Sequence, residues 1–183
     1  FYFCSMLEES FHTLERLAEF ARQHKIKIAF NPSTYLAEKG LRHLKYIISR
    51  IELLVLNREE ASLLVGKDSM EGLLFKLKSL GPEIVVITDG KNDLYIIDKK
   101  HIYTAKPPFV KVVDATGAGD AFASSFLSGI LRKNDIEFAI KLGIVNSQSV
   151  IMHYGAKNIL LTFREAMKTM KKLKVKMHKK KIK

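Results

Sequence analysis

The sequence predicts an α/β fold in which helices cover both faces of a mainly parallel β-sheet, giving three layers. Short apolar runs, typical of buried strands, alternate with longer segments whose apolar residues recur at helical spacing. This alternation favours parallel strands that are joined by helices and buried on both faces. At 183 residues, 47% of them hydrophobic and 27% charged, the chain is long enough for one globular domain.

Three strands are predicted in the first third of the chain. The first includes Cys4, which we expect to be buried in the core, and a single cysteine excludes an internal disulfide. Residues 11–21 follow with the apolar spacing of a helix that buries one face. A second strand is predicted at 26–30, where Asn31-Pro32 ends it, and a third at 53–56, which runs into a helix.

The rest of the chain adds a strand, a hairpin, another strand and three C-terminal helices. The strand at 84–87 runs into a loop that contains Thr88 and Gly90. Asn92-Asp93 before the apolar residues 94–97 also favours a hairpin turn. Loops that follow parallel strands gather at one edge of such a sheet, which is where ligands bind in open α/β folds.

Residues 113–122, VDATGAGDAF, carry the most informative pattern in the chain. Gly117 and Gly119 free the backbone and leave room for a ligand, and an apolar helix follows at once. The first amides of a helix have no intrahelical acceptor and lie at the positive end of its dipole, so they favour phosphate oxygens. Asp120 beside such amides suits a base that takes a proton from an attacking hydroxyl. Alternatively, Asp120 is an acidic residue favoured by the helix dipole, and the glycines serve a tight loop.

This decamer resembles the C-terminal signature of the ribokinase family, also called the PfkB carbohydrate kinases, and fits every position of its usual form. The resemblance extends from the first residues to about Glu165 and implies the three-layer α/β/α fold of that family. It also implies that Asp120 is the catalytic base that contacts the acceptor hydroxyl. Gly117, Ala118 and Gly119 would form an anion hole for the transferred phosphoryl group.

Two further elements resemble the nucleotide-binding parts of the family. Asn57 and Glu60 match its N-x-x-E element, in which Asn57 would contact the phosphates of ATP and Glu60 would hold Mg²⁺ through water. Alternatively, the same two residues are a helix N-cap and its capping-box partner. Thr88 and Gly90 match the T-x-G-x-x-G loop, in which Asp93 replaces the last glycine.

The resemblance also suggests a second metal ion and a helix over the adenine. Residues 146–156 resemble the helix that closes over the adenine and finishes in a Gly-Ala pair, and Ile144 stands where many relatives have a polar adenine contact. Relatives often bind a monovalent cation such as K⁺ near the motif. The corresponding residues here are Asp114, Thr116, Val150, His153 and Gly155, although His153 is also expected simply at a helix end.

The sugar-binding part of the family has few counterparts in this chain. An acidic residue at the position of Glu8 can reach the sugar, or is favoured there by the helix N-terminus. Complete relatives carry an additional N-terminal portion with a β lid and most sugar contacts, so we expect this chain to be truncated at the N-terminus. A partner chain or a longer parent chain would complete the site, and the full-length form would dimerise through the lid.

The net charge of +12 is concentrated at the C-terminus. Nine lysines and no acidic residue follow Glu165, which leaves +3 for the residues before them. We therefore divide the chain into a kinase domain at 1–165 and a basic tail at 166–183. The tail is expected to be the solvated, frayed end of the last helix, and the alternative is a tether to nucleic acid or an anionic surface.

The sequence thus predicts an ATP- and Mg²⁺-dependent phosphotransferase acting on a hydroxyl of a sugar, sugar phosphate or nucleoside. The alternatives are a non-catalytic nucleotide-binding subunit that lacks the sugar site, and a basic protein associated with nucleic acid. The single cysteine fits a reducing, cytoplasmic location, which we expect for this protein. No segment has the pattern of a signal peptide or a membrane span.

Overall fold

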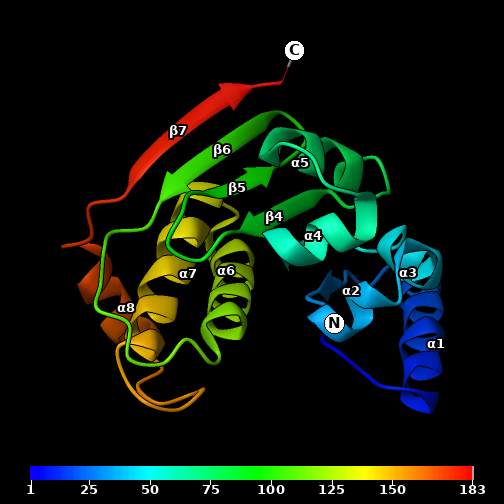
Figure 1. Ribbon diagram of the computed structural model, residues 1–183, viewed down its shortest axis with the longest axis horizontal. Coiled ribbons are helices and arrows are strands. Elements are labelled where there is room, and N and C mark those ends of the chain that lie inside the picture. The colour runs from blue at the N-terminus through cyan, green and yellow to red at the C-terminus, as the bar shows by residue number, and fades with distance from the viewer. Residues whose placement is uncertain (183) are drawn as a thin grey trace. The chain divides into compact units, whose positions relative to one another are not determined.

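The computed structural model describes residues 1–182, which form two compact units (Figure 1). The first unit contains residues 1–104 together with the chain from 178 onward, and the second contains residues 105–177. Within the described residues there are eight helices and one seven-stranded sheet. The α/β class predicted from the sequence is therefore confirmed.

The strands follow one another across the sheet in chain order. They are β1 (Tyr2–Phe3), β2 (Ala29–Phe30), β3 (Leu53–Asn57), β4 (Ile84–Thr88), β5 (Leu94–Ile97), β6 (His101–Lys106) and β7 (Lys176–Lys181). Strands β1 to β4 pair in parallel, and β4 pairs antiparallel with β5. The parallel strands and the hairpin were both predicted, and the predicted second strand is shortened to β2.

The core of the first unit forms where its helices pack on one face of the central strands. These helices are α1 (Glu9–Gln23), α2 (Thr34–Glu38), α3 (Leu41–Ile48), α4 (Arg58–Val65) and α5 (Met70–Lys78). Leu54 and Leu56 of β3 share this core with Val85 and Ile87 of β4, since alternate residues of a strand point to the same face. The sequence predicts one helix between the second and third strands, and the structure has two, α2 and α3.

The second unit is built around two long antiparallel helices joined by a two-residue connection. These are α6 (Ala118–Lys133) and α7 (Ile136–Ile151), and the shorter α8 (Phe163–Met170) packs on α7. A side-chain carbon at Gly129 would lie 2.7 Å from Cα of Ala139, so glycine allows α6 and α7 to approach closely. The three C-terminal helices predicted from the sequence are all present.

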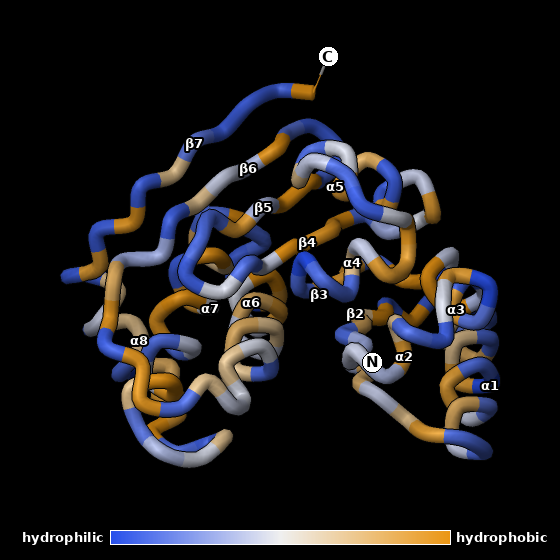
Figure 2. Tube along the Cα trace, viewed as in Figure 1, coloured by the Kyte–Doolittle hydropathy of each residue, from blue (hydrophilic) through white to orange (hydrophobic). Residues whose placement is uncertain are grey.

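The lysine-rich C-terminus differs from the prediction. Helix α8 ends at Met170, and residues Lys176–Lys181 form the edge strand β7, labelled in Figure 2, rather than a frayed helix end. The amide of Ile182 donates to the carbonyl oxygen of Lys100, and Nζ of Lys180 lies 3.2 Å from a carboxylate oxygen of Glu71. Lysine at an edge strand discourages pairing with other chains. The predicted division at residue 165 stays a prediction.

Two other expectations are wrong. Cys4 is exposed rather than buried, because β1 ends at Phe3 and the chain leaves the sheet before it reaches the cysteine. Helix α7 ends at Ile151, so the pair Gly155-Ala156 lies in the loop after the helix and not at its last turn. No helix in residues 1–182 combines the length and the apolar content that crossing a membrane requires.

Candidate functional site

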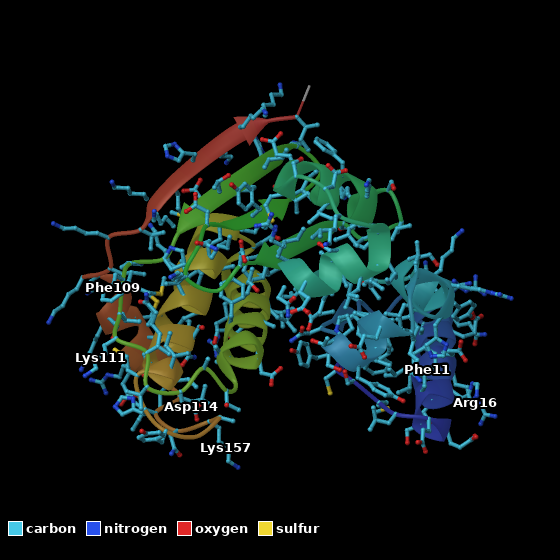
Figure 3. All side chains as sticks on the ribbon, in the orientation of Figure 1. Phe11, Arg16, Phe109, Lys111, Asp114 and Lys157 are labelled. Atoms are coloured by element: carbon cyan, nitrogen blue, oxygen red, sulfur yellow. The ribbon has the colours of Figure 1, made fainter. Side chains whose placement is uncertain are left out.

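In the second unit, the turn that precedes α6 is held against the C-terminal end of α7. The amides of Val113 and Asp114 both donate to the carbonyl oxygen of Ile151, at 2.8 and 3.2 Å. Asp114, which is labelled in Figure 3, then accepts the amide of Thr116 at Oδ1, at 2.9 Å, and the amide of Gly155 at Oδ2, at 3.0 Å. The carboxylate of Asp114 thus joins the turn to the loop that follows α7.

These hydrogen bonds determine the charge state of Asp114. Donors stabilise the ionised form of a carboxyl group, because the negatively charged carboxylate accepts hydrogen bonds more strongly than the neutral acid does. The Thr116 hydroxyl and amide, followed by the Gly155 amide, lower the pKa of Asp114 below its ordinary value. Asp114 is therefore ionised at neutral pH.

The two glycines of the motif have different environments. Gly117 is the N-cap of α6 and has φ of 79°, in the left-handed region that favours glycine. A side-chain carbon there would lie 2.9 Å from Cα of Ala156 and would overlap the carbonyl oxygen of that residue. At Gly119, a side-chain carbon would have no other atom within 4 Å. Gly117 is thus required by the packing of the turn, whereas Gly119 leaves open space at the start of the helix.

Asp120 lies in the first turn of α6 and is exposed. Its carbonyl oxygen accepts a hydrogen bond from the hydroxyl of Ser124 at 2.7 Å. The first helical backbone bond joins the amide of Ala121 to the carbonyl of Gly117, and the amide of Ala118 donates to Ala115 at 3.3 Å. Asp120 thus stands at the positive end of a helix of 16 residues, beside the amides of its first turn.

The structure brings together several of the residues predicted to bind a monovalent cation. Asp114, Thr116 and Gly155 are joined by the hydrogen bonds described above, while the carbonyl of Val150 accepts the amide of His153 at 3.1 Å. His153 follows the end of α7, as predicted, and its Nδ1 lies 2.9 Å from the carbonyl oxygen of Ser149. Hydrogen bonds within the chain account for these contacts, and the cation stays a prediction.

In the first unit, Asn57 and Glu60 form a complete capping box at the start of α4. Oδ1 of Asn57 accepts the amide of Glu60 at 2.8 Å, and Oε2 of Glu60 accepts the amide of Asn57 at 2.9 Å. The other carboxylate oxygen of Glu60 accepts the hydroxyl of Thr34 at 3.2 Å. Thr34 was not predicted, since the contact joins residues 26 positions apart. The capping geometry is present, and contacts with ATP or Mg²⁺ stay predictions.

Thr88 and Gly90 follow the neighbouring strand. Asn57 and Thr88 are direct partners in the parallel register of β3 and β4, so the two loops start side by side. Gly90 has φ of 55°, which suits glycine in the turn toward β5. An ion pair that the sequence does not indicate joins the two loops: NH1 of Arg58 lies 3.3 Å from Oδ2 of Asp89.

Glu8 lies apart from this group in the chain, at the N-terminus of α1. Its side chain makes no capping hydrogen bond, and its carbonyl accepts the amide of Phe11 at 2.9 Å. Its φ of 48° and ψ of −125° are values that only glycine adopts without strain. The predicted contact with a sugar stays a prediction.

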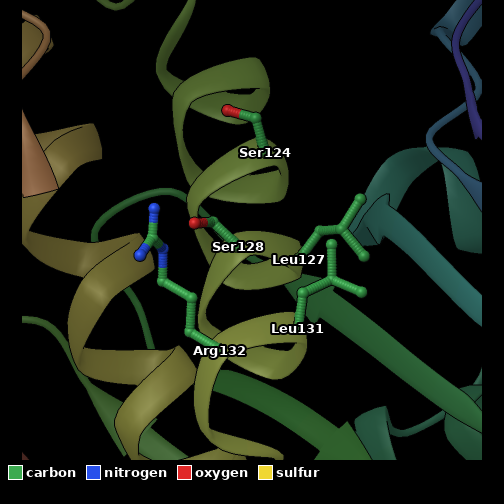
Figure 4. A pocket seen from close by; sticks show the side chains of 5 residues that line it. All are labelled: Ser124, Leu127, Ser128, Leu131 and Arg132. Atoms are coloured by element: carbon green, nitrogen blue, oxygen red, sulfur yellow. The ribbon is translucent and has the colours of Figure 1, made fainter.

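A hollow of about 360 Å³ lies on the surface of α6 and contains none of the predicted site residues (Figure 4). Its lining comes from α6 alone, namely Ser124, Leu127, Ser128, Leu131 and Arg132. A surface formed by one helix face cannot enclose a ligand. The hollow is therefore not a candidate binding site.

Comparison with known proteins identifies the family. Residues 5–162 match the model of the pfkB family carbohydrate kinases. An uncharacterized sugar kinase of Archaeoglobus fulgidus is 35% identical over 130 residues, which cover 71% of this chain and 52% of that protein. A cytidine kinase of Thermococcus kodakarensis is 30% identical over 153 residues, covering 81% of this chain and 53% of that protein.

A solved structure shows the same fold. A ribokinase II candidate from Escherichia coli, in complex with ATP and Mg²⁺, superimposes with a TM-score of 0.82 at 16% identity, over 94% of this chain and 58% of that one. The chain spans about half the length of the relatives that it matches. With the family model matching most of its residues, this chain belongs to the pfkB family of carbohydrate kinases.

Proposed function

We propose that the protein transfers the γ-phosphoryl group of ATP to a hydroxyl of a sugar, sugar phosphate or nucleoside, with Asp120 as general base. The observation that carries this proposal is the start of α6, where an exposed carboxylate adjoins first-turn amides and the open space at Gly119. An anionic group is favoured at these amides, and a carboxylate beside them can accept a proton. The sugar kinase and cytidine kinase relatives support both acceptor classes.

In the proposed reaction, the acceptor hydroxyl gives its proton to the carboxylate of Asp120. The hydroxyl oxygen then forms a bond to the γ-phosphorus, and the bond from that phosphorus to the bridging oxygen of ADP breaks, with its electron pair leaving on ADP. The amides of Gly117, Ala118 and Gly119 would stabilise the charge on the transferred group, which is typically worth about 10²- to 10³-fold in rate per donor.

The capping box at α4 suits the proposed ATP and Mg²⁺ contacts. Glu60 is buried, and its carboxylate is held by the amide of Asn57 and the hydroxyl of Thr34. A carboxylate fixed in this way can still accept hydrogen bonds from the water shell of Mg²⁺, since each oxygen has two lone pairs. Mg²⁺ would neutralise charge on the phosphates when bound. Asn57 would contact the phosphates, and Thr88 and Gly90 would contact the nucleotide.

The test compares the same substitution at two helix N-termini. Asp120→Asn should lower turnover by about 10²- to 10⁴-fold and leave binding of a nonhydrolysable ATP analogue unchanged in calorimetry. Asp135→Asn is the matched control, because Asp135 caps α7 through Oδ1, an atom that asparagine retains. Ribose, cytidine and fructose 6-phosphate would serve as acceptors. Full turnover by the Asp120 variant would exclude its role as base, and binding without turnover in the parent protein would favour a non-catalytic subunit.

A further inference from the structure

Three of the four buried polar residues in the described part of the chain lie on α6 and α7. They are Ser125, Asn146 and Ser149, and the fourth is Glu60 of the capping box. Burying a polar side chain is unfavourable unless it is hydrogen-bonded, so each such residue needs partners. Here Asn146 and Ser149 form hydrogen bonds with backbone groups of the loop that follows α7.

That loop is residues 152–161, which return from the end of α7 toward α8. The side-chain amide of Asn146 donates from Nδ2 to Ser125 Oγ at 2.8 Å, and its Oδ1 accepts the backbone amide of Leu161 at 2.9 Å. The hydroxyl of Ser149 donates to the carbonyl oxygen of Ile159 at 2.7 Å. Asn146 therefore links the helix that carries Asp120 to the far end of the loop.

This loop is held by apolar burial mainly at its end, where Leu161 packs against the small core of Leu142, Val145 and Ala166. Most of its residues are exposed, including Met152, Tyr154, Ile159 and Leu160. Ile159 has φ of 56°, a conformation that a β-branched residue avoids in the absence of other constraints. The hydrogen bonds from Asn146 and Ser149, together with that of Gly155 to Asp114, thus fix the exposed part of the loop.

The same loop contacts the glycine turn. Ala156 fills the space where a side chain of Gly117 would lie, and the amide of Gly155 donates to Asp114. A displacement of the loop therefore displaces both contacts of the turn. The glycine turn is followed directly by the first amides of α6.

We propose that Asn146 and Ser149 are positioning residues, which fix the loop 152–161 and through it the glycine turn and the start of α6. The restraint of the loop and the glycine turn by these two residues follows from the contacts alone. Its effect on phosphoryl transfer rests on the proposed function. The signal in the sequence is the polar run 146–149, which follows the apolar residues 142–145 of α7.

Hydrogen exchange tests this restraint without any assay of activity. Asn146→Leu keeps a side chain of similar size and removes both of its hydrogen bonds, while Ser149→Ala removes one. In both variants, we expect the amide hydrogens of Leu161 and Gly155 to exchange at least about tenfold faster. The amide of Thr116, which donates to the same Asp114 carboxylate as Gly155, should exchange faster by a similar factor. Ser147→Ala, at the neighbouring half-buried serine of α7, is the matched control and should change none of them.

Faster exchange at Leu161 and Gly155 with Thr116 unchanged would overturn the inference, because the turn would then be independent of the loop. If Asn146→Leu does not fold, the milder Ser149→Ala variant is used instead, and unchanged exchange at Thr116 again overturns the inference. In the transfer assay, the positioning variants should lower kcat and leave the Kd for the ATP analogue within about twofold. Unchanged kcat, with Asp120→Asn inactive, would refute the positioning role, whereas an active Asp120→Asn variant would refute only the proposed function.

Discussion

Replacing each glycine of the motif by alanine should have opposite effects on stability. At Gly117 the added carbon enters the left-handed region, which costs about 1–2 kcal/mol for a residue with a side chain. It would also lie 2.7 Å from the carbonyl carbon of Ala156, and overlap with a rigid neighbour typically costs about 1–3 kcal/mol. The reduced entropy of the unfolded chain returns about 0.4–1 kcal/mol. We expect a net loss of about 1–4.5 kcal/mol.

Gly119→Ala is the matched control two residues away. Its backbone is helical and the added carbon meets nothing within 4 Å, so the entropy effect alone should stabilise the protein by about 0.4–1 kcal/mol. The same carbon would occupy the open space at the first turn. If phosphate binds there, this variant should bind the ATP analogue at least about tenfold more weakly although it is fully folded.

Urea denaturation followed by circular dichroism provides the measurement. With a slope of about 2 kcal/mol per molar urea, the Gly117 variant should unfold at a urea concentration about 0.5–2 M lower than the parent protein. The Gly119 variant should unfold at the same concentration or slightly later. Equal midpoints for both variants would show that the turn does not pack against Ala156 in solution, and the reasoning for the site would fail with it.

Three further predictions follow from single contacts. Asn57→Ala removes the N-cap of α4 and Ser69→Ala removes that of α5, so each should lower the free energy of unfolding, measured with urea, by about 0.5–2 kcal/mol. In calorimetry, only the Asn57 variant should weaken ATP binding. The pKa of Asp114 is lowered in the folded state. The ionised Asp114 side chain should therefore stabilise the protein fully above the unfolded pKa of about 3.9, and this stabilisation should be lost as the pH falls through the folded pKa. Denaturation curves of Asp114→Asn should lack this acid dependence. Glu8→Gly should raise the free energy of unfolding by about 1 kcal/mol through relief of backbone strain, and an unchanged or lower midpoint would contradict the strained conformation.

Much of the fold could be predicted because local patterns specify it. Residues 53–56 and 84–87 form continuous apolar runs that end in polar loops, and both became central parallel strands. The helix at 118 begins where the glycine turn ends, as the motif predicts. The capping box of Asn57 and Glu60 is also a pattern within four residues, so it was available to sequence analysis as the alternative interpretation.

The expectations that failed depend on contacts between distant parts of the chain. Lysine has no strong preference for strands, and residues 176–181 become a strand because β6 offers a free edge beside them. Cys4 is exposed because the short β1 ends one residue before it. In neither case do the neighbouring residues in the sequence contain the deciding information.

By itself, the sequence determined the family motif, the order of most elements and the residue types at the start of α6, because these depend on short-range spacing and helix-end chemistry. Only the tertiary structure decided that Gly117 is packed against Ala156 and that Asp114 joins the turn to Gly155. It alone showed that Asn146 connects two helices and a loop. These contacts join residues 15 to 41 positions apart, and such pairings are selected by the packing of the whole unit rather than by any local pattern.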